Sequence, residues 1–170
     1  RADELAQSFV DVTFLNAGCD QYFSFDPSAL EAEAASLGRE ALAASPSSDQ
    51  YQSNVSARLD KRLADLEGTG TLSLCVETER KLRRQGIDTG ISGPSFDCIL
   101  ATTTTEQAIC HTPEIWASDQ AVSKAYFDIR KLLPKDLRST FLDSQREWKD
   151  RRDKCGSQPA CLISAYGERL

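Results

Sequence analysis

The sequence predicts an all-α protein built from two small helical modules that are stapled by disulfide bonds. Apolar residues recur at spacings of three and four along most of the 170-residue chain, and no segment has the pattern of a β-hairpin. Six cysteines, an even number in a short chain, favour disulfides and an oxidising compartment. A Gly- and Pro-rich stretch, residues 86–94, indicates a linker or long loop. We therefore expect one module over residues 1–90 and a second over residues 91–170, each of them bundle-like.

Four helices are expected in the first module, each with one apolar face. Asp26 is expected to cap the second helix, because its carboxylate can accept backbone N–H groups and Pro27 suits the first helical position. Breaks at Pro46-Ser47-Ser48 and Gly68-Thr69-Gly70 leave short connections, which predict a small antiparallel bundle. Helices that dock separately onto the second module are the alternative. The expected inner faces are Leu5, Phe9, Val12 and Leu15; Leu30, Ala34, Leu37 and Ala41; Tyr51, Val55, Leu59, Leu63 and Leu66; and Leu72, Cys75, Glu79 and Leu82.

The second module also contains four expected helices. Thr103 and Glu106 have the spacing of a capping box and begin a short helix that ends near Cys110. Thr112-Pro113 begins the next helix, and a long helix follows Pro134. The expected inner faces are Ile115, Val122, Tyr126, Ile129 and Leu133; Leu137, Phe141, Trp148 and Arg152; and, in a last helix, Leu162, Tyr166 and Arg169.

The charge distribution limits the partners that we expect. Residues 1–90 carry 9 Lys and Arg against 15 Asp and Glu, whereas residues 91–170 carry 11 of each, so the net charge of -6 belongs to the first module. A general nucleic-acid binder needs a basic face, so nucleic acid is not an expected partner. No apolar run approaches the roughly 20 residues of a membrane-spanning helix. Because Arg1 opens directly onto a helical pattern, we expect either a mature chain after signal removal or a trimmed one.

The cysteines are expected to form structural disulfides. Six thiols allow 15 pairings, and the sequence does not choose among them, but proximity favours two pairs in the second module and leaves a third pair in the first module. A zinc site would need paired two-residue spacings and a redox centre would need Cys-x-x-Cys, and the chain has neither. We expect no metal and no other cofactor. The favoured pairs are Cys19–Cys75, Cys98–Cys110 and Cys155–Cys161.

Two charged residues stand out because they fall on apolar helix faces. Asp119 lies four residues after Ile115 and three before Val122, and Arg152 lies four residues after Trp148. An inward-facing charge is costly unless it is paired. We therefore predict an Asp119–Arg152 ion pair that holds two helices in register, in a structural rather than a catalytic role.

The sequence contains no catalytic constellation, so an enzyme is not expected. It lacks a Gly-rich phosphate loop, a Gly-x-Ser-x-Gly elbow and a His-Glu-x-x-His motif. Its one histidine, His111, is expected to be an exposed turn residue at a helix start.

The second module carries an ordered set of motifs: Ser95-Phe96-Asp97-Cys98, Glu106-Gln107-Ala108-Ile109-Cys110, Asp119, Tyr126, Gln145-Arg146-Glu147-Trp148, Arg152-Asp153-Lys154-Cys155, Cys161-Leu162, Tyr166 and Arg169. With these motifs, residues 94–170 resemble the lysozyme-inhibitor LprI N-terminal domain family, which is found in bacterial envelopes. The resemblance implies a secreted or periplasmic four-helix domain, two internal disulfides (Cys98–Cys110 and Cys155–Cys161) and an aromatic core from Phe96, Tyr126, Trp148 and Tyr166. For some members it also implies inhibition of lysozyme. It identifies no inhibitory contact residues, and Trp116-Ala117-Ser118 departs from the small or aliphatic residues usual before the motif's Asp.

Two functions follow as hypotheses. The first is a periplasmic or secreted binding protein that inhibits a basic lysozyme, which the acidic first module could attract over long range. The alternative is an envelope interaction module, an assembly or virulence adaptor, that inhibits no enzyme. Residues 1–90 resemble no family that we can name.

Overall fold

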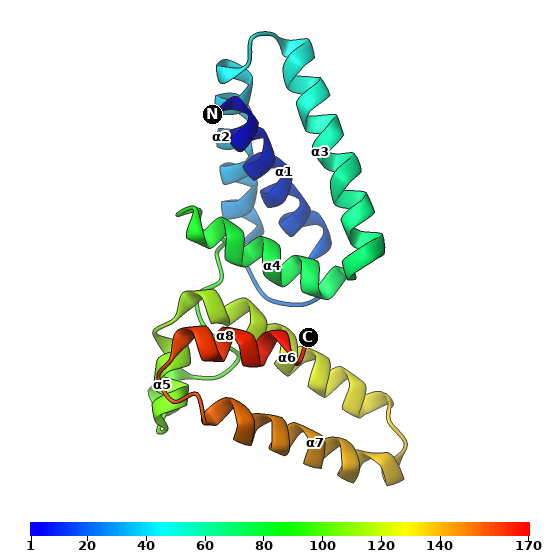
Figure 1. Cartoon of the computed structure of the whole chain (residues 1–170), viewed down its shortest axis with the longest axis vertical. Helices are drawn as coiled ribbons and strands as arrows, with labels where there is room; N and C mark the ends of the chain where they lie inside the picture. Colours follow the sequence, from blue (N-terminus) through cyan, green and yellow to red (C-terminus); the bar gives the residue numbers. More distant parts are fainter. The chain divides into compact units, whose positions relative to one another are not determined.

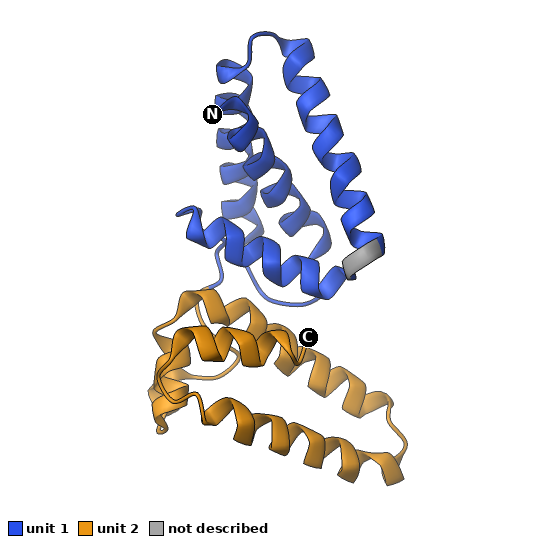
Figure 2. Ribbon diagram, in the orientation of Figure 1, with its two compact units in different colours: residues 1–91 blue, residues 92–170 orange. Residues whose placement is uncertain are grey.

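The computed structural model describes residues 1–67 and 70–170, and the chain divides into two compact units (Figure 2). Unit 1 is Arg1–Ile91 and unit 2 is Ser92–Leu170. The described residues form helices and no strand, which confirms the all-α prediction. The break expected at Gly68 and Thr69 lies outside the described residues.

Unit 1 consists of three helices that run alongside one another and a fourth that lies across them near one end (Figure 1). The second helix begins as predicted, because the Asp26 carboxylate accepts hydrogen bonds from the backbone N–H groups of Ser28 (2.9 Å) and Ala29 (3.3 Å). The transverse fourth helix differs from the simple antiparallel bundle that the short connections predict. The helices are α1 (Ala2–Gly18), α2 (Pro27–Ala44), α3 (Ser48–Thr69) and α4 (Thr71–Arg84).

The predicted apolar face of α3 is only partly covered: Tyr51, Val55 and Leu66 are half-buried, whereas its two central leucines are exposed. Leu59 and Leu63 are 42% and 62% exposed, and none of the described residues of α3 is fully buried. This helix contacts its neighbours through cations instead. Arg58 pairs with Asp3 of α1 at 3.3 Å, and the Arg62 guanidinium lies over the Phe14 ring at 5.1 Å from its centroid.

A buried carboxylate joins three helices of unit 1. Asp11 of α1 is fully buried, and it forms ion pairs with Arg62 of α3 and, at 2.6 Å, with Lys81 of α4. Gln7 donates a third hydrogen bond to it at 3.0 Å. Removing a carboxylate from water is tolerated only when such partners replace the lost hydration. Asp11 therefore fixes the positions of α3 and α4 relative to α1.

The first part of the Gly- and Pro-rich stretch is irregular, as expected, but it packs firmly against unit 1. Thr89 is fully buried and Ile91 is 2% exposed. Gly90 adopts a positive φ of 72°, and a Cβ there would lie 2.7 Å from the Asp26 backbone nitrogen. Only glycine can fill that position without displacing the neighbouring backbone.

A second buried carboxylate holds this stretch to α4. Glu79 Oε1 accepts hydrogen bonds from Arg83 Nε (2.6 Å) and the Thr89 hydroxyl (2.7 Å). Arg83 Nη2 in turn donates to the Thr89 hydroxyl and to the Ile91 carbonyl. The segment that leaves unit 1 is thus fixed by a polar network inside that unit.

Unit 2 contains a 3-10 turn and four helices, with α8 beside α6 and the α6–α7 pair joined by a tight turn (Figure 1). Its core consists of seven buried residues: Ile109, Ile115, Val122, Trp148, Cys155, Leu162 and Tyr166. Ile129 and Leu137, expected on inner faces, are 44% and 49% exposed, because α6 and α7 extend beyond this core. The elements are η1 (Cys98–Leu100), α5 (Thr104–Cys110), α6 (Pro113–Leu132), α7 (Lys135–Asp153) and α8 (Pro159–Gly167).

All six cysteines form disulfides, in the three predicted pairs. Cys19–Cys75 closes 56 residues of unit 1, whereas Cys98–Cys110 and Cys155–Cys161 close 12 and 6 residues of unit 2. Within the part of the chain that the structure describes, every helix is too short or too polar to cross a bilayer.

The three crosslinks should differ in their contribution to stability. In the chain-entropy account, the Cys19–Cys75 loop stabilises the folded state by about 4 kcal/mol and the Cys155–Cys161 loop by about 2 kcal/mol. We expect Cys19→Ser/Cys75→Ser to lower the free energy of unfolding more than Cys155→Ser/Cys161→Ser. Urea unfolding of the full chain, followed by circular dichroism, measures both. An equal or reversed order would contradict the expectation.

The Glu79 network predicts a pH dependence. Burial raises the pKa of the Glu79 carboxyl, although Arg83 and Thr89 oppose that rise. The folded state therefore binds the proton more tightly than the unfolded state, so the contribution of Glu79 to stability falls as pH rises from about 4.3 through its raised pKa. We expect the free energy of unfolding of the wild type, relative to Glu79→Gln, to decline with pH over this window in urea unfolding. A flat or rising difference would show that the Arg83 pair outweighs burial.

Candidate functional site

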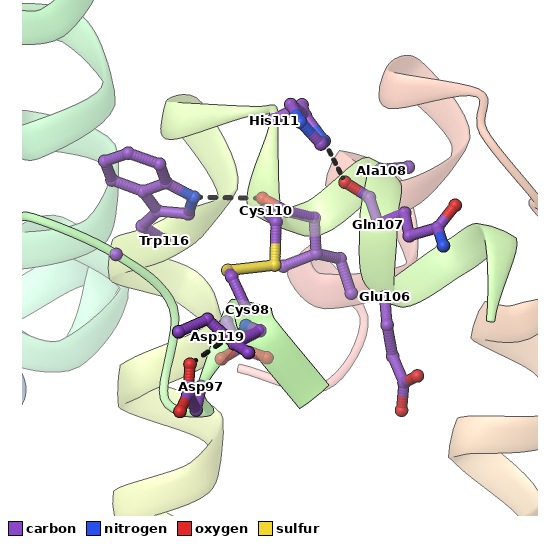
Figure 3. The surroundings of a disulfide bond; sticks show 12 residues. Asp97, Cys98, Glu106, Gln107, Ala108, Cys110, His111, Trp116 and Asp119 are labelled. Carbon is purple, nitrogen blue, oxygen red and sulfur yellow. Dashed lines mark hydrogen bonds between the residues drawn. A yellow bond between two sulfur atoms is a disulfide. The ribbon is translucent and has the colours of Figure 1, made fainter. Parts of the chain in front are cut away.

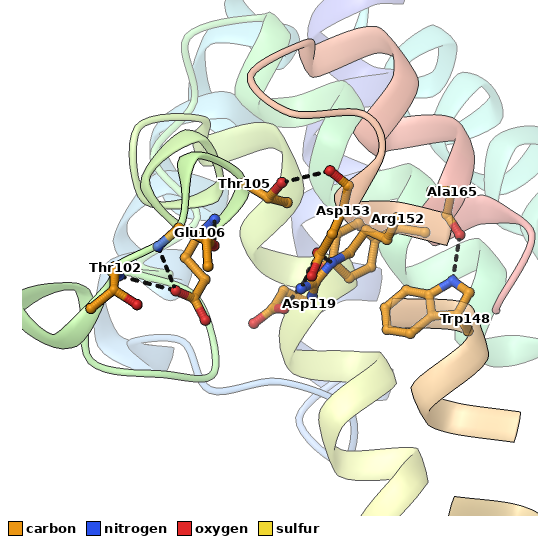
Figure 4. A network of polar contacts seen from close by, with 10 residues as sticks. Thr102, Thr105, Glu106, Asp119, Trp148, Arg152, Asp153 and Ala165 are labelled. Atoms are coloured by element: carbon orange, nitrogen blue, oxygen red, sulfur yellow. Dashed lines mark hydrogen bonds and ion pairs between the residues drawn. The ribbon is translucent and has the colours of Figure 1, made fainter. Parts of the chain in front are cut away.

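The candidate site lies in unit 2 and rests on a chain of buried polar groups (Figure 4). The Tyr166 hydroxyl of α8 donates to Asp119 Oδ1 of α6 at 2.6 Å and accepts from Arg152 Nη1 of α7 at 3.1 Å. Asp119 is 5% exposed, Arg152 6% and Tyr166 fully buried. Three helices are thus joined through one hydroxyl group.

The predicted direct Asp119–Arg152 ion pair is corrected by this arrangement. Arg152 forms its ion pair with Asp153, whose Oδ1 accepts from Nη2 at 2.7 Å and from Nε at 2.9 Å. The second oxygen of Asp119 accepts the Ser95 backbone N–H at 2.6 Å. The two residues do meet on the inner faces of their helices, as expected, but the Tyr166 hydroxyl mediates the contact.

The protonation states in this network follow from burial and neighbouring charge. Burial and the Asp119 carboxylate raise the pKa of Tyr166 well above its ordinary value, so the hydroxyl stays protonated and donates a hydrogen bond to Asp119. Burial alone would lower the pKa of Arg152, but Tyr166 and Asp153 outweigh it and raise that pKa. The network therefore consists of a charged guanidinium, a neutral hydroxyl and a carboxylate acceptor.

Aromatic residues surround the network. Trp148 is 3% exposed, donates its indole N–H to the Ala165 carbonyl at 3.0 Å, and contacts the edge of Tyr166 at a centroid distance of 5.3 Å. Arg152 and Arg169 both lie over its ring, at 5.4 and 5.9 Å. Trp148 and Tyr166 occupy the core, whereas Phe96 and Tyr126, expected with them, are only half-buried.

An open cavity of about 490 Å³ adjoins this network; we refer to it as the α6–α7 groove. Its volume lies within the range of small-molecule sites. The buried Asp119, Trp148 and Arg152 form its floor. One wall is Val122, Tyr126 and Phe127 of α6 with Phe96, and the other is Leu142, Arg146 and Lys149 of α7.

The second surface feature of unit 2 is the η1 turn, residues 97–101. Ile99 is 90% exposed and Leu100 is 73% exposed. The turn is nevertheless fixed: Asp97 Oδ1 accepts the Ile99 N–H at 2.9 Å, and the Asp97 carbonyl accepts the Leu100 N–H at 3.0 Å. Two large aliphatic side chains are therefore presented to solvent on a well-ordered backbone.

A disulfide anchors the η1 turn to α5 (Figure 3). The Cys98–Cys110 bond connects the turn to the end of α5, and the start of that helix is fixed by the predicted Thr103–Glu106 capping box. Backbone hydrogen bonds from Thr103 and Thr102 lower the pKa of Glu106, so its carboxylate stays charged. His111 is exposed, as expected, and its Nδ1 lies 2.6 Å from the Gln107 carbonyl.

Unit 1 has a smaller cavity, of about 320 Å³, whose charges largely offset one another. Arg58, Lys61, Arg62 and Lys81 line it, but so do Asp65 and Glu77, and Asp11 pairs with two of the cations. This balance offers no clear charge preference to a ligand, so we place the candidate site in unit 2.

The sequence analysis named several residues that line the groove, but it missed the exposed pair on the η1 turn and the row of cations on α7. The groove residues that it named are Phe96, Asp119, Tyr126, Trp148 and Arg152. Ile99 and Leu100 directly follow Cys98 in a polar stretch, and this adjacency was a detectable signal. Arg146, Lys149 and Arg152 are spaced by three on one helix, which places them along one side. Neither pattern shows that the space opposite these side chains is left unfilled by a neighbouring helix.

Comparison of the chain with protein-family models, curated proteins and solved structures finds no match. The resemblance of residues 94–170 to the LprI N-terminal domain family therefore stays a prediction, and the functional argument rests on the geometry of unit 2.

Replacing Tyr166 with Phe should destabilise unit 2. The change removes the hydroxyl that connects Asp119 with Arg152 and leaves both buried groups short of a partner, at a cost of about 1–3 kcal/mol. Both tryptophans lie in unit 2, so urea unfolding followed by tryptophan fluorescence reports on this unit. Tyr126→Phe is the matched control, since no hydrogen bond from its hydroxyl is found among the described residues, and it should change stability by less than about 0.5 kcal/mol. Equal effects of the two variants would contradict a special role for Tyr166.

Proposed function

We propose that this protein is a secreted or periplasmic bacterial binding protein that inhibits a lysozyme, and that the η1 turn inserts into the enzyme. The observation that supports this proposal most directly is the exposure of Ile99 and Leu100 on a turn held by a disulfide. The resemblance to the LprI N-terminal domain family supplies the class of target.

The turn is suited to binding because it loses little conformational entropy when it contacts a partner. Its backbone is fixed by the Asp97 hydrogen bonds and by the Cys98–Cys110 crosslink, so only side-chain freedom is lost. Burying a large aliphatic side chain releases about 1.5–3 kcal/mol. A convex, rigid, apolar turn is complementary to a concave enzyme cleft.

The charge of unit 1 supports a cationic target. The excess of acidic residues lies in residues 1–90, and most of these carboxylates are exposed. Long-range attraction of this kind raises the association rate of a basic partner and weakens as ionic strength rises. Inhibition of a basic lysozyme should therefore be weaker at high salt, mainly through slower association.

The three disulfides support an extracytoplasmic location, because such bonds form and persist in oxidising compartments. The Cys98–Cys110 bond has one exposed cysteine, Cys98, and is therefore open to reduction in the cytosol. The location and the target thus belong to one proposal: a protein that meets lysozyme outside the cytoplasm.

The test is the double variant Ile99→Ser/Leu100→Ser. We expect it to weaken inhibition by about 100-fold or more, since two buried aliphatic contacts are lost. A peptidoglycan-lysis assay measures inhibition, and calorimetric titration against the lysozyme measures affinity. Leu132→Ser is the matched control, because Leu132 is 85% exposed in the same unit but lies at the end of α6.

Two outcomes would overturn the proposal at different points. Absence of inhibition by the wild type at micromolar protein and low salt would reject lysozyme as the target. In that case the envelope interaction module would be preferred, and recovery of a resident envelope protein in a pull-down would support it. Inhibition that survives in the double variant would reject the η1 turn as the contact.

A further inference from the structure

We infer that the α6–α7 groove is a second binding site, for a small amphipathic anion whose carboxylate or phosphate group lies on the α7 cations and whose apolar body lies on the α6 wall. This site is separate from the η1 turn and does not depend on the proposed inhibition of lysozyme.

The α7 wall has an excess of positive charge. Arg146, Lys149 and Arg152 line the groove at successive spacings of three residues, so they form a row along one side of the helix. The Lys149 ammonium forms no ion pair within 4 Å and no hydrogen bond among the described residues, although it is close enough to Glu106 to help lower the pKa of that carboxyl. The pair between Arg146 and Asp143, at 3.3 Å, has both side chains about two-thirds exposed and contributes little.

The carboxylates near the groove are already engaged. Both oxygens of Asp119 accept hydrogen bonds, from Tyr166 and from the Ser95 N–H. Glu106 Oε2 accepts two backbone N–H groups at the start of α5, and Asp153 accepts the Arg152 guanidinium. These acceptors stabilise the fold. Glu106 attracts Lys149 without forming an ion pair with it, and Arg146 has only an exposed pair with Asp143, so both cations can still bind an anion in the groove.

Arg152 extends the row to the floor of the groove. A guanidinium has five N–H groups, and three of them donate to Asp153 and Tyr166. One N–H on each terminal nitrogen therefore has no acceptor assigned to it. Because Asp153 and Tyr166 hold the group in place, its two remaining donors keep a fixed direction, which suits two oxygens of a carboxylate or of a phosphate.

The opposite wall is aromatic, with Tyr126 and Phe127 of α6 and Phe96 lining it. The Tyr126 ring contacts Phe127 at a centroid distance of 5.3 Å, and it is held from the other side by stacking on Phe141 of α7 at 5.2 Å. Phe127 is 52% exposed at the rim. An apolar wall that faces a row of cations is matched by a ligand with one apolar side and one anionic end, and a purely polar anion would leave the aromatic wall in water.

The experiment titrates the full-length protein with three probes below their micelle concentrations: dodecanoate, dodecyl phosphate and the uncharged dodecyl maltoside. Fluorescence of Trp148 on the groove floor and calorimetry follow binding. We expect an anionic probe to bind with one-to-one stoichiometry, at least about 10-fold more tightly than the uncharged probe. Preference between dodecanoate and dodecyl phosphate identifies the carboxylate or the phosphate as the natural head group.

The variant Lys149→Glu should weaken binding of the anionic probe by about 10-fold or more, because it reverses the charge of one cation in the row. Lys135→Glu, the same change at an exposed site on α7 outside the groove, should leave the affinity unchanged. Circular dichroism checks that both variants fold. Ile99→Ser/Leu100→Ser should bind the probe as the wild type does, which separates this site from the proposed inhibitory turn.

Three results would overturn the inference. Equal affinity for charged and uncharged probes would show that the aromatic wall alone binds the ligand. An unchanged affinity in Lys149→Glu would show that the row of cations does not contact the anionic group. Tighter binding of an acidic peptide than of either anionic amphiphile would reject a small-molecule ligand.

Discussion

The arrangement of unit 2 depends on one hydroxyl group. Tyr166 comes from α8, yet its oxygen contacts a carboxylate on α6 and a guanidinium on α7. Because α8 carries this connection, α6 and α7 do not have to pack directly against each other along their length. The α6–α7 groove remains open for that reason, and its floor is the same network that holds the three helices together.

Unit 1 uses the same principle with different residues. Asp11 is buried where three helices meet, and two cations from α3 and α4 neutralise it. The solvent-facing leucines of α3 show that polar contacts replace much of the apolar packing expected there. Buried charge of this kind contributes more to specifying one arrangement than to net stability, since desolvation offsets much of the attraction. The 56-residue Cys19–Cys75 loop therefore has a large share in stabilising the unit.

Contacts between residues close in the sequence were predictable, whereas contacts between side chains of different helices were not. The caps at Asp26 and Thr103 followed from side chains that bond to backbone groups only two or three residues away. The prediction that Leu59 and Leu63 of α3 are buried was wrong. Their spacing shows that they share one side of the helix, but it does not show that a neighbouring helix covers that side. Asp119 and Arg152 were rightly placed on inner faces. Their direct pairing failed because Asp153 is closer along the chain and Tyr166 arrives from a third helix.

The two proposed binding features have a common physical origin. Ile99 and Leu100 on the turn, and Phe127 on the groove rim, are apolar groups that a small core leaves uncovered. Because these side chains stay in water, the unit does not gain the hydrophobic stabilisation that their burial would give. A unit of this size therefore needs another source of stability. Its two short disulfides and its buried polar network provide that source. The Cys98–Cys110 bond holds the turn that carries Ile99 and Leu100, and the buried network holds the floor of the α6–α7 groove. Less conformational entropy is therefore lost when a partner binds, which makes the exposed surface useful for recognition.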